Sequence, residues 1–286
     1  MKDLVSVIIP NHNYGRCLGQ CINSALTQTY NKIEVFVIDN GSSDEPRDLL
    51  EQFRGDVHVI LQEDLGQAAA RNMGIVSSRG NTLAFLDADD YWENEKIERQ
   101  MELLENDTQL VYTSIRRFNE NNSHTTIDSG KFRGNCSKLY LSNPGVSVVL
   151  NGESSAIISR SLIRKIGLFN QELNSSSGWD FFRRAMNLSL INFIDAPLTN
   201  CRVHTHNMSN NYVKNAEDLR KCYQLMPIKN PDLVAVKHYY LRAITKLEYN
   251  FFKGFLKKRM ICEATKACRN LLSNLVKLLG GLPRRD

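Results

Sequence analysis

The 286-residue chain lacks several features that would each place it in a different class of protein. No apolar stretch is long enough to cross a membrane, and Met1, Lys2 and Asp3 lead directly into a strand-like run without the pattern of a signal peptide. The seven cysteines are odd in number and include no paired CxxC motif, which argues against a disulfide framework and a cysteine zinc site. We therefore expect a cytoplasmic protein whose thiols are reduced and mostly buried.

The sequence also lacks the two glycine-rich loops that commonly bind nucleotides. A dinucleotide-binding fold would carry GxGxxG after its first strand, and a kinase or ATPase would carry a P-loop. Residues 10–15 instead read Pro-Asn-His-Asn-Tyr-Gly. A nucleotidyltransferase is disfavoured as well, because its first loop should be rich in Gly and bear Lys or Arg.

The charge of the chain is unevenly distributed. The hydrophobic content of 42% and charged content of 23% are ordinary for a globular protein, and the net charge is +5. Residues 237–286 contain twelve Lys and Arg against three Asp and Glu, so this segment carries +9 and residues 1–236 carry −4. The basic character therefore belongs to the end of the chain.

Short apolar runs alternate with helical patterns over the first 113 residues. Residues 4–9 and 33–38 are strand-like, and apolar side chains at helical spacing between them predict a crossover helix over 16–28. The pattern continues with strands expected at 57–61, 82–86 and 110–113, and with helices expected at 67–76 and 93–104. This alternation predicts an α/β fold with a parallel, doubly wound sheet.

The regular pattern weakens after residue 113. Residues 116–151 are rich in Asn, Ser, Thr and Gly, which predicts a long irregular connection. Beyond it we expect strands at 155–159 and 190–194, helices at 161–166 and 179–188, and mostly helical structure over 216–279.

Residues 82–92 are the most informative stretch, because an apolar strand leads directly into Asp87, Asp89 and Asp90. Carboxylates this close repel one another, so a divalent cation such as Mg²⁺ or Mn²⁺ would stabilise the group and could hold a diphosphate. The alternative is an Asp-rich turn in which Asp90 caps a helix starting near Trp92.

Asp39 follows the second strand, at the edge where α/β folds present a carboxylate to a nucleoside. The alternative is an Asx turn with Gly41.

Four segments in order resemble the signature blocks of family 2 glycosyltransferases, a large bacterial group with the GT-A fold. They are residues 5–13 (VSVIIPNHN), 35–44 (VFVIDNGSSD), 66–75 (GQAAARNMGI) and 83–92 (LAFLDADDYW). Weaker likeness continues through 154–170, 179–185 and 202–204, so the resemblance covers about the first 210 residues.

The resemblance implies a GT-A domain over residues 1–215, with a nucleotide-binding part at about 1–113 and an acceptor-binding part at about 114–215. A basic helical extension follows at 216–286. The implied reaction is inverting and metal-dependent. It transfers a sugar, usually from a UDP-sugar, to a hydroxyl of a glycan or lipid-linked saccharide in bacterial surface-polysaccharide synthesis.

The resemblance also assigns residues that bind the nucleotide sugar, namely Pro10, Asn11, His12, Asn13, Asp39, Arg71, Asp87, Ala88 and Asp89. The family often has a second Asp where this chain has Asn40, which removes one charge. Arg71 suits a base edge or diphosphate, and its alternative is a surface ion pair with an acid such as Asp64.

The expected metal site combines Asp89, as a direct ligand of Mn²⁺ or Mg²⁺, with His204 of an Arg-x-His segment. His206 is a second candidate, and a purely structural role is the alternative for either histidine.

An inverting transfer requires a general base on the acceptor side. Relatives carry an acid immediately before the tryptophan of a Glu-Asp-Trp-Asp-like motif, where this chain has Gly178. We therefore expect Asp180 to be the base, although it could be a helix N-terminal acid stabilised by the helix dipole. Trp179 would shape the acceptor pocket or pack in the core, and Glu153 is the further acceptor-side carboxylate.

Gly178 motivates a second hypothesis, in which the protein binds a nucleotide sugar without transferring it. The basic C-terminal segment has an apolar helical pattern that could contact an anionic membrane, pack on the rest of the chain or pair two subunits. We expect no nucleic acid among the partners.

Overall fold

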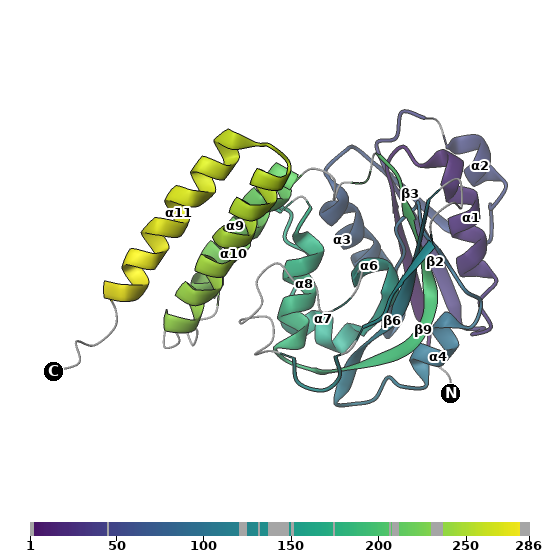
Figure 1. Cartoon of the computed structure of the whole chain (residues 1–286). Helices are drawn as coiled ribbons and strands as arrows, with labels where there is room; N and C mark the ends of the chain where they lie inside the picture. Colours follow the sequence, from purple (N-terminus) through teal and green to yellow (C-terminus); the bar gives the residue numbers. More distant parts are fainter. Residues whose placement is uncertain are drawn as a thin grey trace. The chain divides into compact units, whose positions relative to one another are not determined.

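The computed structural model describes residues 3–44, 46–119, 125–130, 132–136, 149, 152–173, 175–205, 207, 212–229 and 237–280. The described residues form two compact units, which we call the sheet unit and the helical unit (Figure 1). The described residues up to 207 belong to the sheet unit and those from 212 to the helical unit, and the boundary expected at 215 stays a prediction. Each unit is described by itself.

Within the described residues, the sheet unit contains one sheet of nine strands in the order β3-β2-β1-β4-β8-β6-β9-β5, with β7 paired to β6. The strands are β1 (Val5–Asn11), β2 (Ile33–Asn40), β3 (His58–Gln62), β4 (Thr82–Phe85), β5 (Tyr91–Trp92), β6 (Thr108–Asn119), β7 (Thr125–Asp128), β8 (Ala156–Ser159) and β9 (Leu190–Val203). The four strands β3, β2, β1 and β4 are parallel, as the sequence predicts.

The second half of the sheet is mixed, so the sheet as a whole is mostly parallel, as expected for a GT-A-like domain. β8 runs antiparallel to both β4 and β6, whereas β9 runs parallel to β6. The α/β class and the GT-A-like architecture are confirmed.

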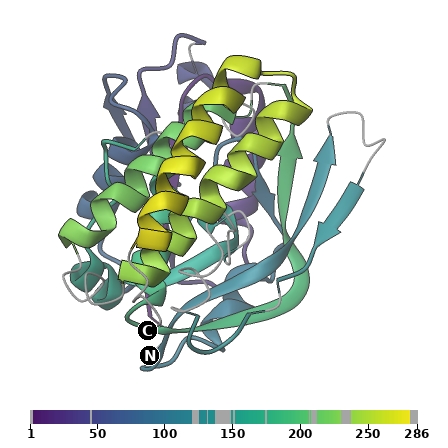
Figure 2. The ribbon, with the colours of Figure 1, turned by 60° about the vertical axis from the view of Figure 1, so that its left-hand side comes forward.

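Helices flank the sheet, as Figures 1 and 2 show. They are α1 (Gly15–Leu26), α2 (Arg47–Glu51), α3 (Gln67–Ser77), α4 (Lys96–Met101), α6 (Gly152–Ser155), α7 (Arg160–Ile166) and α8 (Ser177–Met186). Ser159 caps α7, because its side-chain oxygen accepts a hydrogen bond from the backbone N–H of Leu162, and Gly167 ends the helix with a φ of 79°.

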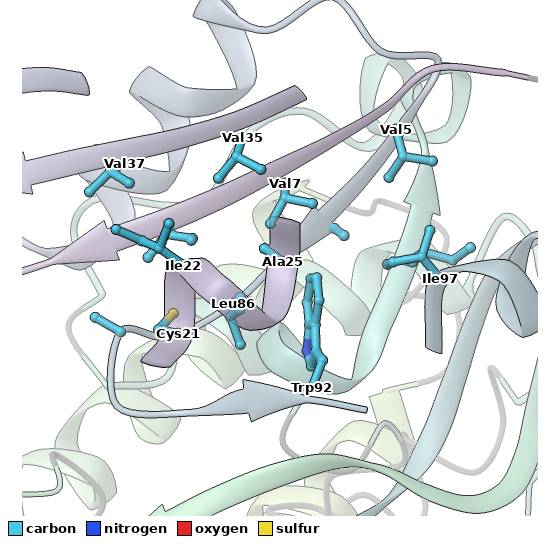
Figure 3. Close-up of a cluster of buried hydrophobic side chains, with 14 of the residues drawn as sticks. Val5, Val7, Cys21, Ile22, Ala25, Val35, Val37, Leu86, Trp92 and Ile97 are labelled. Atoms are coloured by element: carbon cyan, nitrogen blue, oxygen red, sulfur yellow. The ribbon is translucent and has the colours of Figure 1, made fainter. Parts of the chain in front are cut away.

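The core beside α1 explains why the N-terminal segment folds as a βαβ unit (Figure 3). Alternate residues of β1 and β2, such as Val7 and Val37, point into it together with one face of α1, where Cys21 and Ile22 lie. Cys17 is buried on the same helix. Both cysteines of α1 are therefore buried free thiols, as expected for the chain.

α3 lies close to β1 because residue 74 is a glycine. A Cβ atom added there would approach Cγ1 of Ile8 to 3.0 Å and would clash with its Cγ2. The glycine therefore keeps α3 in the position from which it contributes Arg71 to the site.

We expected an irregular connection from residue 116, and this expectation was wrong for its first residues. β6 continues to Asn119 and pairs with both β7 and β9, and β9 runs nine residues beyond the predicted end at 194. Polar residues in these strands have partners that the sequence pattern does not reveal. The Oγ1 atoms of Thr113 and Thr199 lie 3.2 Å apart, and Ser114 donates to Asp195 at 3.1 Å.

The helical unit contains α9 (Tyr212–Lys229), α10 (Lys237–Lys257) and α11 (Ile261–Gly280), in agreement with the predicted helical segment. Glu248 of α10 is buried and joins the three helices. It accepts two hydrogen bonds from Arg220 of α9, at 2.6 and 2.8 Å, and one from Asn270 of α11 at 3.2 Å. In the part of the chain that the structure describes, no helix is sufficiently long and apolar to span a membrane.

Candidate active site

The carboxyl ends of three parallel strands bring the predicted residues together at one edge of the sheet. Asn11 at the end of β1 is in register with Asp39 near the end of β2. On the other side of β1, the chain leaving β4 stays paired, because the N–H of Leu86 donates to the carbonyl of Ile8 at 3.0 Å. This edge is where α/β sheets bind ligands.

Hydrogen bonds of its backbone N–H and carbonyl groups hold the acidic loop, residues 87–90, in place. The N–H of Asp90 donates to the carbonyl of Asp87 at 2.9 Å, which closes a turn. The N–H of Asp87 donates to the Oγ atom of Ser154 at 3.1 Å, and the thiol of Cys21 contacts the Asp87 carbonyl at 3.6 Å. The loop is therefore tied to α1 and to α6.

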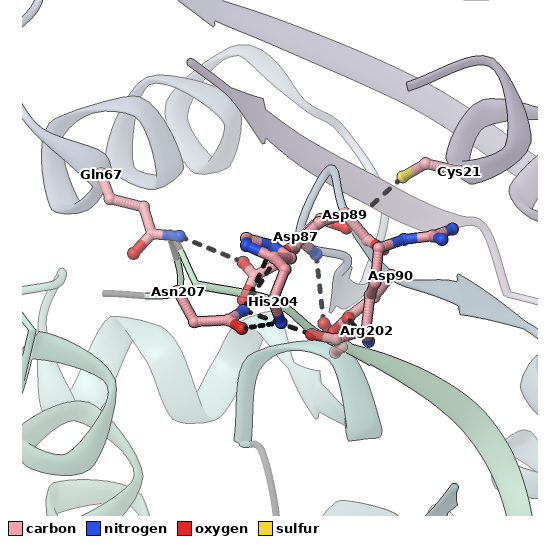
Figure 4. A network of polar contacts seen from close by, with 9 residues as sticks. Cys21, Gln67, Asp87, Asp89, Asp90, Arg202, His204 and Asn207 are labelled. Atoms are coloured by element: carbon pink, nitrogen blue, oxygen red, sulfur yellow. Dashed lines mark hydrogen bonds and ion pairs between the residues drawn. The ribbon is translucent and has the colours of Figure 1, made fainter. Parts of the chain in front are cut away.

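Asp89 contacts His204, which lies immediately after β9 and 115 positions away in the chain (Figure 4). The Oδ2 atom of Asp89 is 2.9 Å from Nε2 of His204, and the amide of Asn207 donates to the same oxygen at 3.3 Å. Burial raises the pKa of Asp89, and the neighbouring Asp87 carboxylate raises it further. The ring of Tyr14 lies 5.7 Å from that of His204, and burial with the nearby Asp89 charge raises the pKa of Tyr14.

Asp90 is fully enclosed and does not cap a helix. The chain forms β5 directly after it, and α4 begins only at Lys96, so the alternative of a helix cap at Asp90 is excluded. Its carboxylate accepts a hydrogen bond from the N–H of Arg202 at 3.0 Å. Burial raises the pKa of Asp90 well above its usual range, with repulsion from Asp89 and Asp87 adding to the effect. Asp90 therefore connects β9 to the acidic loop.

Arg71 connects Asp87 to Glu153. Its guanidinium is 1% exposed, donates to Asp87 Oδ1 at 2.7 Å and approaches Oε1 of Glu153 to 3.3 Å. The alternative partner Asp64 is excluded, because it bonds to Asn40 and to the backbone N–H of Gly66. The positive charge of Arg71 is therefore shared by the carboxylates of Asp87 and Glu153.

We use the term nucleoside side for residues 10–13, 39–44 and 62–66. The side-chain amide of Asn11 donates to Asp39 Oδ1 at 2.9 Å, and the hydroxyl of Ser42 donates to the same oxygen at 2.5 Å. Asn13 has a φ of 61°, and its side-chain oxygen accepts from the N–H of Ser43 at 2.7 Å.

Other residues expected on the nucleoside side also lie at the strand ends. Pro10 is within β1, and the ring Nδ1 atom of His12 is 2.8 Å from the carbonyl of Asn40. Ala88 is buried between the two aspartates of the acidic loop, with 2% of its surface exposed. All nine residues predicted to bind the nucleotide sugar therefore belong to the loops and strand ends of this edge or to α3.

Asn40, the departure from the family pattern, has a clear structural role. Its side-chain N–H donates to Asp64 Oδ1 at 2.7 Å. Its own oxygen accepts from Gln62 at 2.6 Å and from the N–H of Leu65 at 3.1 Å. An amide fits here because it both donates and accepts, whereas a carboxylate only accepts.

Asp180, the predicted base, lies on α8 and is neutralised by two arginines of the same helix. Arg183 donates to its Oδ1 atom at 3.1 Å and Arg184 to its Oδ2 atom at 2.9 Å. Arg184 also donates to the carbonyls of Ile166 and Leu168. Trp179, one residue before, is partly exposed. The base role of Asp180 remains a prediction.

Sequence reasoning missed several polar residues that complete the site. Gln67 donates to Asp87 Oδ1 at 3.3 Å, whereas Ser42, Ser154 and Asn207 make the contacts described above. Gln67 and Ser42 lie within the signature blocks, and Asn207 lies three residues after His204, so proximity to a motif was the available signal. His206 lies outside the described residues.

The donor set fits a divalent cation in part. Within the described ranges, no group of three or more His, Cys, Asp and Glu side chains is arranged to hold a metal ion. Asp89 and His204 do supply a carboxylate oxygen and an imidazole nitrogen, beside the further negative charge of Asp87. Such a pair suffices when a bound diphosphate and waters complete the coordination, as is common for Mg²⁺.

Comparison with known proteins gives a consistent family. The profile of glycosyl transferase family 2 matches residues 6–167. An uncharacterized glycosyltransferase of Rickettsia typhi is 26% identical over 272 residues, which cover 91% of this chain and 84% of that protein. One from Nostoc is 42% identical over 105 residues, 35% of this chain and 33% of that protein. Bacillus subtilis TuaG, named for teichuronic acid biosynthesis, is 37% identical over 107 residues, 36% of this chain and 42% of that protein.

Solved structures share the fold. S. aureus TarS 1-349 in complex with UDP-GlcNAc has a TM-score of 0.62 at 14% identity, covering 99% of this chain and 93% of that chain. The mannosyltransferase PcManGT from Pyrobaculum calidifontis, in complex with GDP-Man and Mn²⁺, has a TM-score of 0.59 at 16% identity, covering 98% and 88%. The profile match, which spans more than half of the chain, shows that this protein belongs to glycosyl transferase family 2.

Proposed function

We propose that the protein is an inverting glycosyltransferase that transfers a sugar from a nucleoside diphosphate, with UDP as the leaving group, to a hydroxyl of a glycan or lipid-linked saccharide. The observation that carries the proposal is the meeting of Asp89 with His204, at 2.9 Å, at the strand edge that also presents Asp39. The two residues are 115 positions apart in the sequence, so β9 has to be in place beside the rest of the sheet before they meet.

Different residues would bind the base and the diphosphate of the nucleotide-sugar donor. Both hydrogen bonds that Asp39 accepts from described residues go to Oδ1, which leaves Oδ2 for an N–H of the base. Asp89 and His204 would hold Mn²⁺ or Mg²⁺, which when bound offsets negative charge on the departing diphosphate. Arg71 and Gln67 hold Asp87 in place beside it.

The relatives support the donor class and the setting. One structural neighbour was solved with UDP-GlcNAc, another with GDP-Man and Mn²⁺, and the Bacillus relative is named for teichuronic acid biosynthesis. We favour UDP over GDP because the single Asp39 carboxylate suits the one N–H that uracil presents on its pairing edge.

A screen of nucleotide sugars tests the proposal. Purified protein is incubated with UDP- and GDP-sugars, with and without a panel of simple glycosides, in Mn²⁺, Mg²⁺ or EDTA, and release of the nucleoside diphosphate is measured. We expect release from one UDP-sugar that requires a divalent cation and rises with an acceptor. Equal release in EDTA would contradict the metal site, and preference for GDP-sugars would contradict the role of Asp39.

A non-catalytic binding protein is the second candidate, and the absence of a side chain at Gly178 favours it. Such a protein would bind a UDP-sugar in a calorimetric titration without releasing UDP with any acceptor of the panel. Turnover in the screen would remove this candidate.

We also propose that the helical unit contacts an anionic membrane bearing the acceptor. Phe251 and Phe255 are buried, but Leu272 and Val276 of α11 are 58% and 69% exposed, and the neighbouring Arg269 and Lys277 of the same helix are exposed. An apolar surface flanked by basic residues favours such a membrane. Flotation with vesicles containing phosphatidylglycerol should show binding that falls in a Leu272→Asn, Val276→Asn variant. Undiminished binding by that variant would contradict the proposal.

A further inference from the structure

Gly178 leaves a space at the start of α8, and the carboxylate of Glu153 fills it. A Cβ atom built on Gly178 would overlap the Cδ and Oε1 atoms of Glu153 and would lie 2.9 Å from its Oε2 atom. A side chain at position 178 would therefore project into the volume that this carboxylate occupies. The chain thus places an acid at this point in space, although it comes from a different element.

Glu153 is also connected directly to the acidic loop. The next residue, Ser154, accepts a hydrogen bond from the N–H of Asp87 at 3.1 Å. The guanidinium of Arg71 lies between the carboxylates of Glu153 and Asp87, at 3.3 and 2.7 Å. One charged group therefore separates Glu153 from the proposed diphosphate site, which is a suitable position for the acceptor side of a transfer.

The environment of Glu153 suits a proton acceptor. Its side chain is 21% exposed, so it is enclosed but reachable. Burial raises its pKa and so does the charge of Asp87, while the opposing effect of Arg71 only partly cancels them. A carboxylate with a raised pKa is a stronger base than a fully exposed one.

Asp180 differs in each of these respects. Positions 178 and 180 are about 200° apart around a helix, so their side chains leave opposite faces. Both oxygens of Asp180 accept hydrogen bonds from arginine side chains, and its side chain is 10% exposed. A carboxylate held in this way stabilises α8 and its contact with α7.

We propose that Glu153 is the general base of the transfer, replacing an acid that position 178 does not supply. This inference rests on the proposed function. The acceptor O–H loses its proton to the Glu153 carboxylate while its oxygen forms a bond to the anomeric carbon. The bond from that carbon to the diphosphate oxygen breaks, and the nucleoside diphosphate leaves with the electron pair. The proton then passes from Glu153 to water.

The test compares Glu153→Gln with the wild type in the UDP-sugar screen, and Glu105→Gln, a change of an exposed glutamate, is the control. We expect a 10²–10⁴-fold lower rate of UDP release, the usual scale for a general base. The affinity for UDP with Mn²⁺, measured by calorimetry, should change less than about three-fold, since the change spares donor contacts. Release by Glu153→Gln within about three-fold of the wild-type rate would overturn the inference, as would an equal loss of UDP affinity.

A relocated carboxylate provides the second test. Glu153→Ala vacates the space, and Gly178→Asp in the same chain returns a carboxylate to it from α8. We expect the double variant to release UDP at least about ten-fold faster than Glu153→Ala alone. If Glu153→Ala and the double variant both bind UDP but release it at equal rates, the inference is overturned. A wild-type protein that releases no UDP with any donor would instead contradict the proposed function, so the two failures are distinct.

Discussion

The nucleoside side and the acidic loop lie on the same edge of the sheet, yet their carboxylates have opposite kinds of neighbour. Asp39 accepts hydrogen bonds from a hydroxyl and an amide, which are neutral donors. Burial instead raises the pKa of both Asp89 and Asp90, and the charge of Asp87 raises both further, with Asp89 adding to the effect on Asp90. One edge of a sheet can therefore present a hydrogen-bonding surface to a base and a cluster of carboxylates, only partly balanced by Arg71, to a cation.

The largest expected effect tests the acidic loop. Asp89→Asn keeps the shape of the side chain but removes the charge, so UDP release should fall on the order of 10³-fold, or about 4 kcal/mol. Asp56→Asn, a change of an exposed aspartate elsewhere, is the matched control and should have no effect. Turnover by Asp89→Asn close to the wild-type rate would show that the loop does not need this charge.

Removal of Arg71 should have an effect of nearly the same size, but on the free energy of unfolding. Arg71→Met leaves the Asp87 and Glu153 carboxylates without their shared cation, and breaking a buried pair typically costs about 3–5 kcal/mol. Urea denaturation measures the effect. The control is Arg54→Met, which breaks an exposed pair with Glu51 and should change the free energy of unfolding by less than about 0.5 kcal/mol. Similar losses of unfolding free energy in Arg71→Met and Arg54→Met would contradict the greater contribution expected of the buried ion pairs.

Asp39→Ala should have an intermediate effect on ligand binding. Loss of a charged hydrogen-bond partner costs about 1–3 kcal/mol, so UDP should bind roughly 5–150-fold more weakly. Because the nucleoside side acts through hydrogen bonds, the loss should persist in EDTA, whereas any contribution of Asp89 should disappear there. Calorimetric titration of UDP with and without Mn²⁺ distinguishes the two, and an unchanged affinity would remove Asp39 from the site.

The sequence was sufficient for those parts of the site that lie within continuous motifs. Asp39 lies near the end of β2 and Asp87 soon after β4, both in the parallel half, so their place at the sheet edge follows from the strand pattern alone. The contact of Asp89 with His204 was reached through the resemblance, because it depends on β9 running for 14 residues beside β6. That length could not be predicted, since polar residues such as Thr113 and Thr199 satisfy each other only in the folded sheet.

On the acceptor side, motif reasoning and the fold give different candidates for the general base. Alignment on Trp179 placed the missing acid at Gly178 and then turned to the nearest carboxylate in the sequence, Asp180. The carboxylate nearest in space is Glu153, 25 positions earlier, because α6 brings it against the start of α8. Sequence distance is a poor guide to spatial distance between elements, and only the fold reveals the relation.

The smallest expected effect tests whether the nucleoside side depends on neutral donors. Asn40→Asp keeps an oxygen for Gln62 and the Leu65 N–H but replaces the donor to Asp64 by a second carboxylate. We expect a loss of about 1 kcal/mol in the free energy of unfolding, because Asp64 is exposed and water screens part of the repulsion. Adding Asp64→Asn to the variant restores a donor and should recover most of the loss. Urea unfolding of both variants at low salt measures the effect. Two results would contradict this explanation of Asn40. One is an Asn40→Asp variant as stable as the wild type. The other is a double variant less stable than Asn40→Asp alone.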